Sequence, residues 1–396
     1  MNHCQLNTPR RGILIAILLS QIAFGLLAMT ICLPSMQEWA AAFDSDQAAV
    51  QLTFSGYVIA YGAMQLVYGP LSDRYGRKGM VLTGLALACV GSLMAALAPN
   101  LLSLTVARTV QGAGAAAGMV LGRAMVRDLF DGAARTQIMA YVGMLMGVCP
   151  PLAIVIGGQI HVRMGWQANF LAIGLLALVL LLLSWCALPA RKEQTTAHTH
   201  WLLAMAGAYT RLGREPAFLF YVTIAAMSTA TFYSFLGGAP IVLRNYGIGP
   251  DRVGWYMAAL PLAYIAGNYL TSRLIQHSDE RRVMAIGQLA TISGLILMLA
   301  LGLTGLNTPL AFVLPMTLVG MGQGLLVPPC LAGTVGIVPS LAGSAAAVAG
   351  LCQQWMGAVG GYTVGLLQLD GAMGIGILMM GFTLCALSAQ ILLHRR

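Results

Sequence analysis

Charged and glycine residues separate two long apolar runs in the segment Gly69–Lys78, which reads Gly-Pro-Leu-Ser-Asp-Arg-Tyr-Gly-Arg-Lys. Gly69 and Gly76 permit close approach of the backbone and the positive φ of a tight turn. Asp73 falls at the carboxyl end of the preceding predicted helix, where its charge opposes the dipole of that helix. We therefore expect its carboxylate to point at the N-terminus of a neighbouring helix or at an arginine.

A second group of charges, Arg123–Asp128, ends another apolar run. Arg123 and Arg127 are four residues apart and share one face of a helix. We expect Asp73 to pair with one of them in one conformation and to separate from it in another, which would make a latch. Simple anchoring of the helix at the membrane surface is the alternative for Arg123. The residues assigned to the latch are Gly69, Asp73, Arg74, Gly76, Arg77, Arg123, Arg127 and Asp128.

Arg108 lies inside a further apolar run, six positions beyond Leu102. A charge within a membrane helix costs about 2.5–3.5 kcal/mol, so its side chain must face a wet cavity or a partner. Substrate binding or proton coupling is one interpretation, and snorkelling to the outer surface is the other. The polar side chains assigned with Arg108 to substrate binding or proton coupling are Gln111, Thr30, Tyr57, Tyr61, Gln65, Glu38, Gln323 and Gln353.

The composition indicates that the elements positioning these residues are membrane helices. Of 396 residues, 58% are hydrophobic and 8% are charged, whereas soluble proteins contain about 25% charged residues. The formal net charge of +9 comes from basic residues scattered among the loops, which argues against nucleic-acid binding. The eight cysteines lie mostly in apolar runs without metal-ligand spacing, so neither disulfides nor a metal site are expected.

Twelve apolar runs are long enough to cross a bilayer, for which about 20 residues are needed. Six precede a polar stretch and six follow it, which divides the chain into a bundle at 1–188, a central loop at 189–216 and a second bundle at 217–396. The predicted spans are Ile13–Leu33, Gln51–Pro70, Gly79–Pro99, Leu102–Gly122, Ile138–Ile160, Ala168–Leu188, Ala217–Gly237, Val253–Leu270, Met284–Thr304, Pro309–Pro329, Gly343–Gly365 and Ala372–Leu393.

Arginine and lysine favour cytoplasmic loops. Their distribution among the loops places both chain ends and the central loop in the cytoplasm. The two groups of six spans predict an internal repeat, in which two halves enclose a site near the midplane. Gln323-Gly324 in the tenth span repeats Gln111-Gly112 in the fourth.

Three motifs resemble those of the major facilitator superfamily. Gly69–Lys78 resembles the loop between that family's second and third helices, and Arg108–Gly114 resembles its fourth-helix motif R-x-x-Q-G-x-G. The resemblance implies a fold of two pseudo-symmetric six-helix bundles, and it implies that Arg108 takes part in proton coupling. Gly147, Pro150, Pro151, Gly157 and Gly158 resemble the fifth-helix motif of the family's antiporters, so we expect them to bend this helix.

Within that family the chain resembles the Bcr/CflA branch of bicyclomycin and chloramphenicol exporters, which exchange protons for drug. The resemblance implies a bacterial inner-membrane exporter of small organic molecules that is neither an enzyme nor dependent on a cofactor, and that acts as a monomer. One departure is that Thr30 occupies the place of an aspartate in the branch's D-x-x-L-P pattern. Coupling through Glu38 is one alternative. Export of an endogenous anionic metabolite such as a siderophore, bound by Arg108, is the other.

Overall fold

The computed structural model describes residues 8–189, 207, 209–306, 308–338, 341–369 and 371–395. All regular secondary structure in these residues is helical. The helices are α1 (Thr8–Thr30), η1 (Leu33–Ser35), α2 (Met36–Ala42), α3 (Gln47–Tyr75), α4 (Arg77–Ala96), α5 (Leu101–Leu129), α6 (Gly132–Met164), α7 (Trp166–Ala187), α9 (Pro216–Asn245), α10 (Pro250–Met257), α11 (Ala259–Leu274), α12 (Glu280–Leu303), α13 (Pro309–Gly336), α14 (Ala342–Leu366) and α15 (Ala372–His394).

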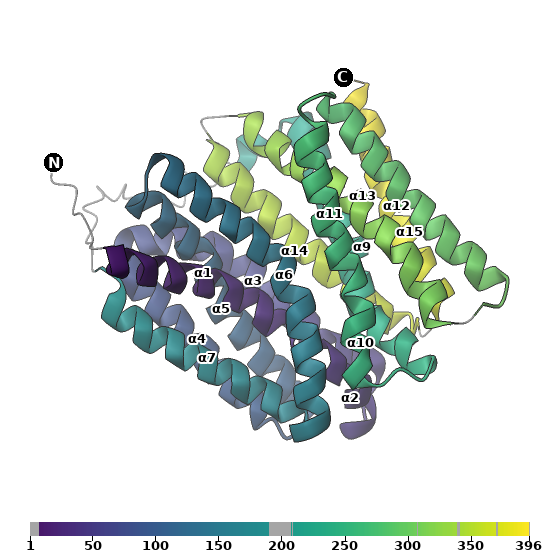
Figure 1. Cartoon of the computed structure of the whole chain (residues 1–396), viewed down its shortest axis with the longest axis horizontal. Coiled ribbons are helices and arrows are strands. Elements are labelled where there is room, and N and C mark those ends of the chain that lie inside the picture. The colour runs from purple at the N-terminus through teal and green to yellow at the C-terminus, as the bar shows by residue number, and fades with distance from the viewer. Residues whose placement is uncertain are drawn as a thin grey trace.

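The helices form two bundles that lie side by side: α1 to α7 make the first half and α9 to α15 the second (Figure 1). The short η1 and α2 continue the first crossing, and α10 leads into α11 to make the eighth. The all-α fold with two six-helix halves is therefore confirmed. The predicted loop at 189–216 lies largely outside the described residues.

Eight helical segments of the described chain are long and apolar enough by themselves to cross a membrane. The segments of the described chain outside this group are α3, α5, α14 and the pair α10–α11. α3 and α5 carry charged residues in their last turns, and α10 and α11 divide one crossing into two shorter helices. These less apolar crossings are the ones that hold most of the candidate site residues.

Capping side chains and a glycine turn set the bounds of the helices around the site. Asp46 Oδ1 accepts from Ala49 N at the start of α3 (2.6 Å), which satisfies one of the free N–H groups there. Gly76, with φ of 87°, separates α3 from α4. Because α3 continues through Pro70 to Tyr75, Gly69 lies within the helix with open space around its missing side chain. The expectation that Gly69 permits a close backbone approach is therefore wrong.

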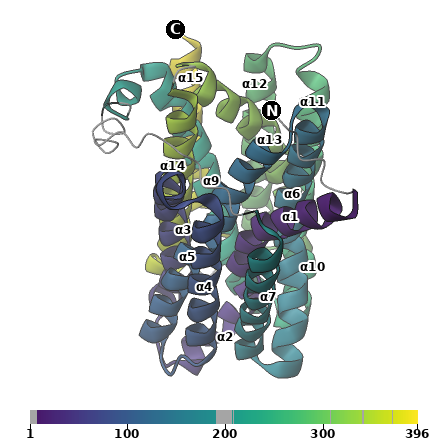
Figure 2. The same ribbon diagram turned by 90° about the vertical axis from the view of Figure 1, so that its left-hand side faces the viewer.

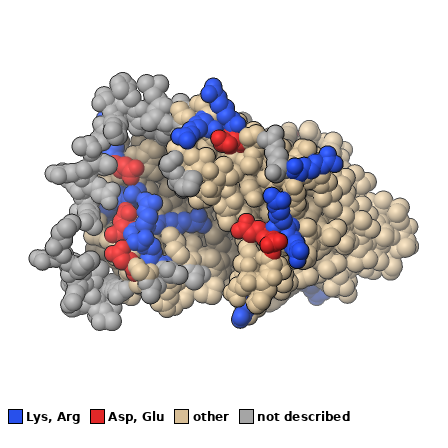
Figure 3. Space-filling model, turned by 90° about the horizontal axis from the view of Figure 1, so that it is seen from above, with Lys and Arg blue, Asp and Glu red and all other residues tan. Residues whose placement is uncertain are grey.

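The C-terminal end of α15 lies at the upper end of the molecule in Figures 1 and 2. We call this the inner end and the opposite one the outer end. Figure 3, which views the inner end, shows Lys, Arg, Asp and Glu side chains gathered over it. That this end faces the cytoplasm stays a prediction from the arginines and lysines of the loops.

Small residues allow α5 to pack closely on three neighbouring helices. A Cβ at Gly112 would lie 2.4 Å from Tyr57 O in α3, and one at Gly118 would lie 2.2 Å from Gln21 O in α1. A Cβ at Gly114 would lie 2.3 Å from Ala88 N in α4. Real Cβ contacts are longer, so only glycine lets these backbones meet.

The second half repeats this packing with different residues. In α13, a Cβ at Gly324 would lie 2.4 Å from Tyr264 O in α11, and one at Gly322 would lie 2.6 Å from Thr291 N in α12. Gly112 and Gly324 each follow a glutamine in the fourth span of their half, and each meets the second span. The glutamine–glycine repeat noted in the sequence thus corresponds to a repeated helix contact.

We predict that Gly114→Ala lowers the free energy of unfolding by about 1–3 kcal/mol, because the added methyl group overpacks the contact between α4 and α5. Gly143→Ala is the matched control, since no atom lies within 4 Å of the position its Cβ would take. Thermal unfolding of the purified protein in detergent, followed with a thiol-reactive dye on the buried cysteines, measures both. Equal melting temperatures for the two variants would contradict the packing explanation.

Candidate functional site

Arg108 is completely buried, and its guanidinium contacts the last turn of α1. Nη1 donates to Ala28 O (2.8 Å), and Nη2 donates to Met29 O (3.2 Å). The carbonyl end of a helix carries partial negative charge, so α1 compensates this arginine, which has no carboxylate among its contacts in the described part of the chain. The ring of Tyr57 lies 4.3 Å from the guanidinium carbon and adds a cation–π contact. The snorkelling interpretation of Arg108 is therefore wrong.

The sequence of α1 explains why carbonyl groups are available to Arg108. Pro34 has no N–H group to donate to the carbonyl of Thr30, four residues before it, and α1 ends at Thr30. The Thr30 hydroxyl donates back to Leu26 O at 2.9 Å, within its own helix. The hydroxyl of Thr30 is therefore directed into its own helix.

A chain of hydrogen bonds extends from Arg108 across the first half. Arg108 Nη1 donates to Gln111 Oε1, and Gln111 Nε2 donates to Ser92 Oγ at 2.7 Å. Ser92 in turn donates to Ala88 O in α4 (2.7 Å). Arg108 and Gln111 were assigned together from the sequence, and the structure places them in direct contact.

Aromatic side chains occupy the middle of the molecule. Tyr57 and Tyr61 of α3 stack with ring centroids 5.9 Å apart, and Tyr57 donates to Gly25 O at 2.7 Å. Tyr233 of α9 donates to Gln354 Oε1 of α14 at 3.0 Å and lies 3.6 Å from the sulfur of Met29. Because Met29 belongs to the first half, this group of side chains lies where the halves meet.

The four predicted site glutamines have different surroundings. Gln111 belongs to the Arg108 chain, and Gln65 lies against Gly350 of α14 in the other half. Gln323 donates to Ser228 O at 3.1 Å, and Gln353 donates to Thr229 Oγ1 at 3.2 Å, so both connect helices within the second half. The sequence assignment missed Gln354, which lies next to Gln353 and contacts Tyr233. The choice between adjacent glutamines depends on the rotation of α14, which the sequence did not indicate.

In the described part of the chain, side-chain hydrogen bonds to backbone carbonyls join the halves in the outer half or at the midplane. Most of the donors are amide groups, so little charge is involved. We call this set the outer interface. It comprises Gln37 Nε2 to Pro240 O (2.6 Å), Arg244 Nη1 to Gln37 O (2.6 Å), Gln51 Nε2 to Gly237 O (2.8 Å), Ser55 Oγ to Ala358 O (2.9 Å) and Gln159 Nε2 to Asp251 O (2.9 Å).

Glycines of α6 bring the two halves together near the same interface. A Cβ at Gly158 would lie 2.1 Å from Pro250 O of α10, and one at Gly147 would lie 2.4 Å from Ile265 Cγ1 of α11. Gly157 faces Ile31 O of the first half in the same way. The helix is continuous through Pro150 and Pro151. The expected bend stays a prediction, whereas the glycines serve close packing.

Glu38 lies at the outer end and is exposed, as its sequence position indicates. Its Oε2 lies 3.0 Å from Nε2 of His161, which is buried near the outer end of α6. The sequence analysis did not identify His161 as the partner, because the two residues are separated by most of the first half. No group of three or more His, Cys, Asp or Glu side chains in the described residues is arranged to hold a metal ion.

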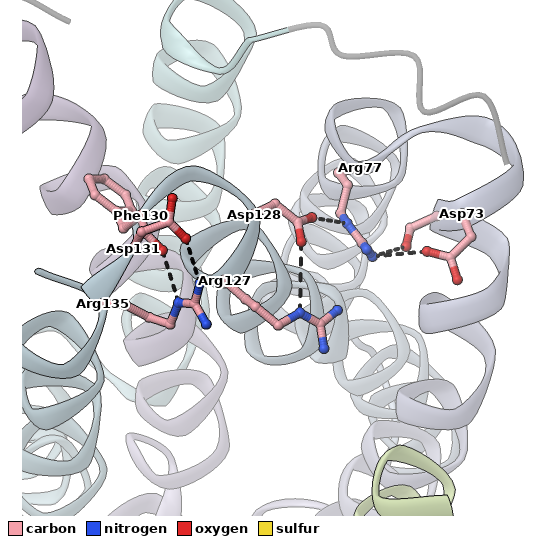
Figure 4. Close-up of polar contacts among 8 residues, drawn as sticks. Asp73, Arg77, Arg127, Asp128, Phe130, Asp131 and Arg135 are labelled. Carbon is pink, nitrogen blue, oxygen red and sulfur yellow. Dashed lines mark hydrogen bonds and ion pairs between the residues drawn. The ribbon is translucent and has the colours of Figure 1, made fainter. Parts of the chain in front are cut away.

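At the inner end, Arg77 joins α4 to α5 (Figure 4). Its Nε lies 2.8 Å from Asp128 Oδ2, its Nη1 lies 3.2 Å from Asp73 Oδ1, and Nη1 also donates to Ser72 Oγ at 2.8 Å. Arg127 Nε lies 3.8 Å from the second oxygen of Asp128. We call Asp73, Arg77, Arg127 and Asp128 the inner latch.

The expected pairing of Asp73 with Arg123 or Arg127 differs from this arrangement. The ion pair described for Asp73 is with Arg77, four residues along the chain, and Asp128 supplies the carboxylate that connects α5 to α4. The hydrogen bond described for Arg123 is instead to Met146 Sδ of α6, at 3.0 Å. Arg74 is exposed, and its guanidinium carbon lies 5.4 Å from the ring centroid of Tyr75.

Residues 13–361 match the family model described as Major Facilitator Superfamily. The chain is 27% identical to a chloramphenicol resistance protein of Pseudomonas aeruginosa, over 81% of this chain and 76% of the relative. It is also 27% identical to multidrug resistance protein D of Escherichia coli strain K12, over 92% of each protein.

Solved structures show the same fold at lower identity. A bacterial homolog of the human lysosomal transporter Spinster, in an inward-facing and unoccupied conformation, superposes with a TM-score of 0.79 at 15% identity. The match covers 98% of this chain and 97% of the other. The resemblance to this family, first seen in three short motifs, thus extends over nearly the whole chain. The protein therefore belongs to the major facilitator superfamily.

Proposed function

We propose that this protein exports small organic molecules, drugs among them, through the inner membrane of a bacterium by alternating access coupled to the proton gradient. The relatives named for chloramphenicol and multidrug resistance support the substrate class. The positions of the contacts between the halves support alternating access. The outer interface closes one end of the molecule, next to an aromatic site at the midplane. In this state substrate enters from the inner end.

The chemistry of the outer interface suits repeated opening. A net contribution of about 0.5–1.5 kcal/mol is typical of one neutral hydrogen bond in a protein. The amide donors of Gln37, Gln51 and Gln159 reach backbone carbonyls of the opposite half, and water replaces such partners when the halves separate. A few bonds of this kind therefore close the outer end without trapping the transporter in one state.

We assign Arg108 to coupling between substrate binding and the position of α1. Its guanidinium holds the end of α1 against α5, and Tyr57 covers it on the substrate side. Its Nε atom is buried without a hydrogen-bond partner in the described part of the chain, so one donor is available to water or substrate. When water or substrate binds to Nε, the guanidinium shifts and its contacts with the carbonyls of α1 change.

The inner latch fixes the turn between α3 and α4 to the end of α5. Arg77 lies mostly buried between the carboxylates of Asp73 and Asp128, which favours its ion pairs over those of exposed arginines. Because these residues all belong to the first half, the latch keeps the inner ends of its helices together while the half moves as a body.

We predict that Arg108→Gln lowers both transport and stability, because Ala28 O and Met29 O lose a charged donor. The free energy of unfolding should fall by about 1–3 kcal/mol, the range found when a buried acceptor is left without its donor. Arg108→Lys keeps the charge but loses the planar fork, so we expect an intermediate loss. Melting temperature and vesicle transport are measured on the same preparations. Unchanged stability in Arg108→Gln would mean that α1 does not depend on this contact.

We predict that Asp128→Asn slows transport severalfold while the protein remains in the membrane, since Arg77 then loses its contact to α5. Asp131→Asn is the control, because Asp131 pairs with Arg135 four residues along the same helix at 2.6 Å. Initial rates are compared in proteoliposomes at matched protein density. Full activity in Asp128→Asn would remove the inner latch from the mechanism.

The proposed export is tested in everted inner-membrane vesicles that contain the protein. Labelled chloramphenicol and ethidium should accumulate when respiration acidifies the vesicle lumen, and a protonophore should release them. Vesicles without the protein are the control. Accumulation that survives the protonophore would contradict proton coupling, and accumulation no greater than in the control for both compounds would contradict drug export.

A further inference from the structure

The short helix α2 lies at the outer end of the molecule (Figures 1 and 2) and carries Gln37, which joins the two halves twice. Gln37 Nε2 donates to Pro240 O at 2.6 Å, and Gln37 O accepts from Arg244 Nη1 at 2.6 Å. α2 has seven residues, and helices this short are not stable without contacts to other elements. The position of Gln37 therefore depends on what holds α2 in place.

The two residues that follow Gln37 attach α2 to the first half. Trp39 is completely buried, and its ring stacks on Phe170 of α7 with the ring centroids 6.1 Å apart. Glu38 Oε2 lies 3.0 Å from Nε2 of His161 in α6. The contact of Trp39 is apolar and does not depend on pH. The contact of Glu38 is different, because its strength changes with the charge on the imidazole ring.

Water reaches the two partners of this contact unequally. The side chain of Glu38 is 54% exposed, and that of His161 is 6% exposed. The buried ring therefore adjoins the water of the outer end through the carboxylate. Imidazole is the side chain that ordinarily changes its charge between about pH 5 and pH 8. The pH at the outer end can thus set the charge of His161 although the ring is buried.

The two nitrogens of His161 have different surroundings. Nε2 faces Glu38, whereas Nδ1 is buried and has no hydrogen-bond partner in the described part of the chain. A second proton makes the ring positive and strengthens its attraction to the carboxylate, but it leaves an N–H group at Nδ1 without an acceptor. Nδ1 lies on the other edge of the ring, so this cost applies whether or not α2 is docked on α6. The attraction to Glu38 acts only when α2 is docked, so protonation favours the docked position.

The other ionisable groups at the outer end are of types that keep their charge in this pH range. Carboxylates ordinarily ionise near pH 4, cysteine and tyrosine above pH 8, and arginine stays positive. Deeper on α5, Arg108 is satisfied by the carbonyls of α1. The helices α7 and η1 carry no charged residue. The charged residues at this end on or beside the elements that pack on α6 and α2 are Asp44, Asp46, Arg163, Arg244, Asp251 and Arg252.

His161 differs from the other histidines of the chain in its predicted side of the membrane. It follows the fifth predicted span, so the sequence places it at the outer end. The sequence predicts cytoplasmic positions for the remaining five, which are His3, His198, His200, His277 and His394. A response to the external pH should therefore depend on His161.

We propose that His161 is a positioning residue for the outer interface: when it takes up a proton from the outer side, it holds Glu38 and thereby keeps Gln37 against α9. This inference rests on the proposed alternating access and adds the group through which external pH favours the closed outer end. The direction suits export driven by inward proton movement. Such a transporter has to close its outer end after protons have bound from that side.

The test measures the separation of the halves at the outer end as a function of pH. Spin labels are attached to full-length protein in nanodiscs through Pro99→Cys and Leu306→Cys, which lie in exposed outer loops of the first and the second half. From about pH 7.5 to about pH 5.5, the ratio of closed to open molecules should rise about threefold to tenfold, the factor that a partly exposed ion pair supplies. A distance distribution that does not change over this range would overturn the proposal.

Variants show whether His161 and Glu38 carry the response. His161→Gln keeps a donor for Glu38 but takes up no proton, so its distance distribution should not depend on pH. Glu38→Gln removes the carboxylate at an exposed position and should have the same effect. His277→Gln is the matched control, because His277 is exposed near the inner end and its loss should leave the response unchanged. A full response in His161→Gln, or in Glu38→Gln should the first variant not fold, would overturn the assignment.

The outcome is separate from that of the export experiment. Accumulation of chloramphenicol in everted vesicles tests export without reference to the distance between the halves. Accumulation together with a distance distribution that ignores pH would leave the proposed function intact and refute the role of His161. A pH response that requires His161, without gradient-driven accumulation of either compound, would support that role and refute the proposed export.

Discussion

The contact between Arg108 and the end of α1 is the interaction on which the first half depends. A buried guanidinium is tolerated because two backbone carbonyls, the amide of Gln111 and the ring of Tyr57 surround it. The negative end of the α1 dipole replaces the carboxylate that would otherwise be needed. The contact requires that α1 end at this depth, where Pro34 has no N–H group to donate to the carbonyl of Thr30. Arg108 therefore holds the end of α1 against α5.

Close helix packing supports this arrangement in both halves. Gly112 and Gly114 allow α5 to approach α3 and α4 at backbone distance, and Gly322 and Gly324 do the same for α13. Hydrocarbon chains of the bilayer are as apolar as leucine, so helix association in a membrane relies on such packing and on hydrogen bonds. Because the two halves repeat the same helix packing, equivalent positions can hold the buried charge of Arg108 in one half and a glycine in the other. Gly320 in α13 takes the place of Arg108 and packs directly on Leu260 O.

The two ends of the molecule use different chemistry. Hydrogen bonds to backbone carbonyls, mostly from neutral side chains, join the halves at the outer end, whereas ion pairs connect helices within the first half at the inner end. Neutral bonds exchange readily with water, and partly buried ion pairs are costly to leave without a partner. A rocking motion of rigid halves needs this combination, because the interface between the halves must open while each half stays intact.

The sequence alone determined the fold and the location of the important segments. Apolar runs of sufficient length specify membrane helices, and the spacing of arginines with glycines around Asp73 and Arg108 identified the family. The sequence could not determine which side chains contact one another. Asp128 rather than Asp73 connects α5 to α4, Gln354 rather than Gln353 contacts Tyr233, and His161 contacts Glu38 across most of the first half. These contacts depend on the rotation of each helix about its axis and on the crossing of helices distant in the chain. Because both are set by glycine contacts and by the break in α1, only the tertiary structure decided that Arg108 is enclosed by the end of α1 while Arg123 contacts Met146 of α6.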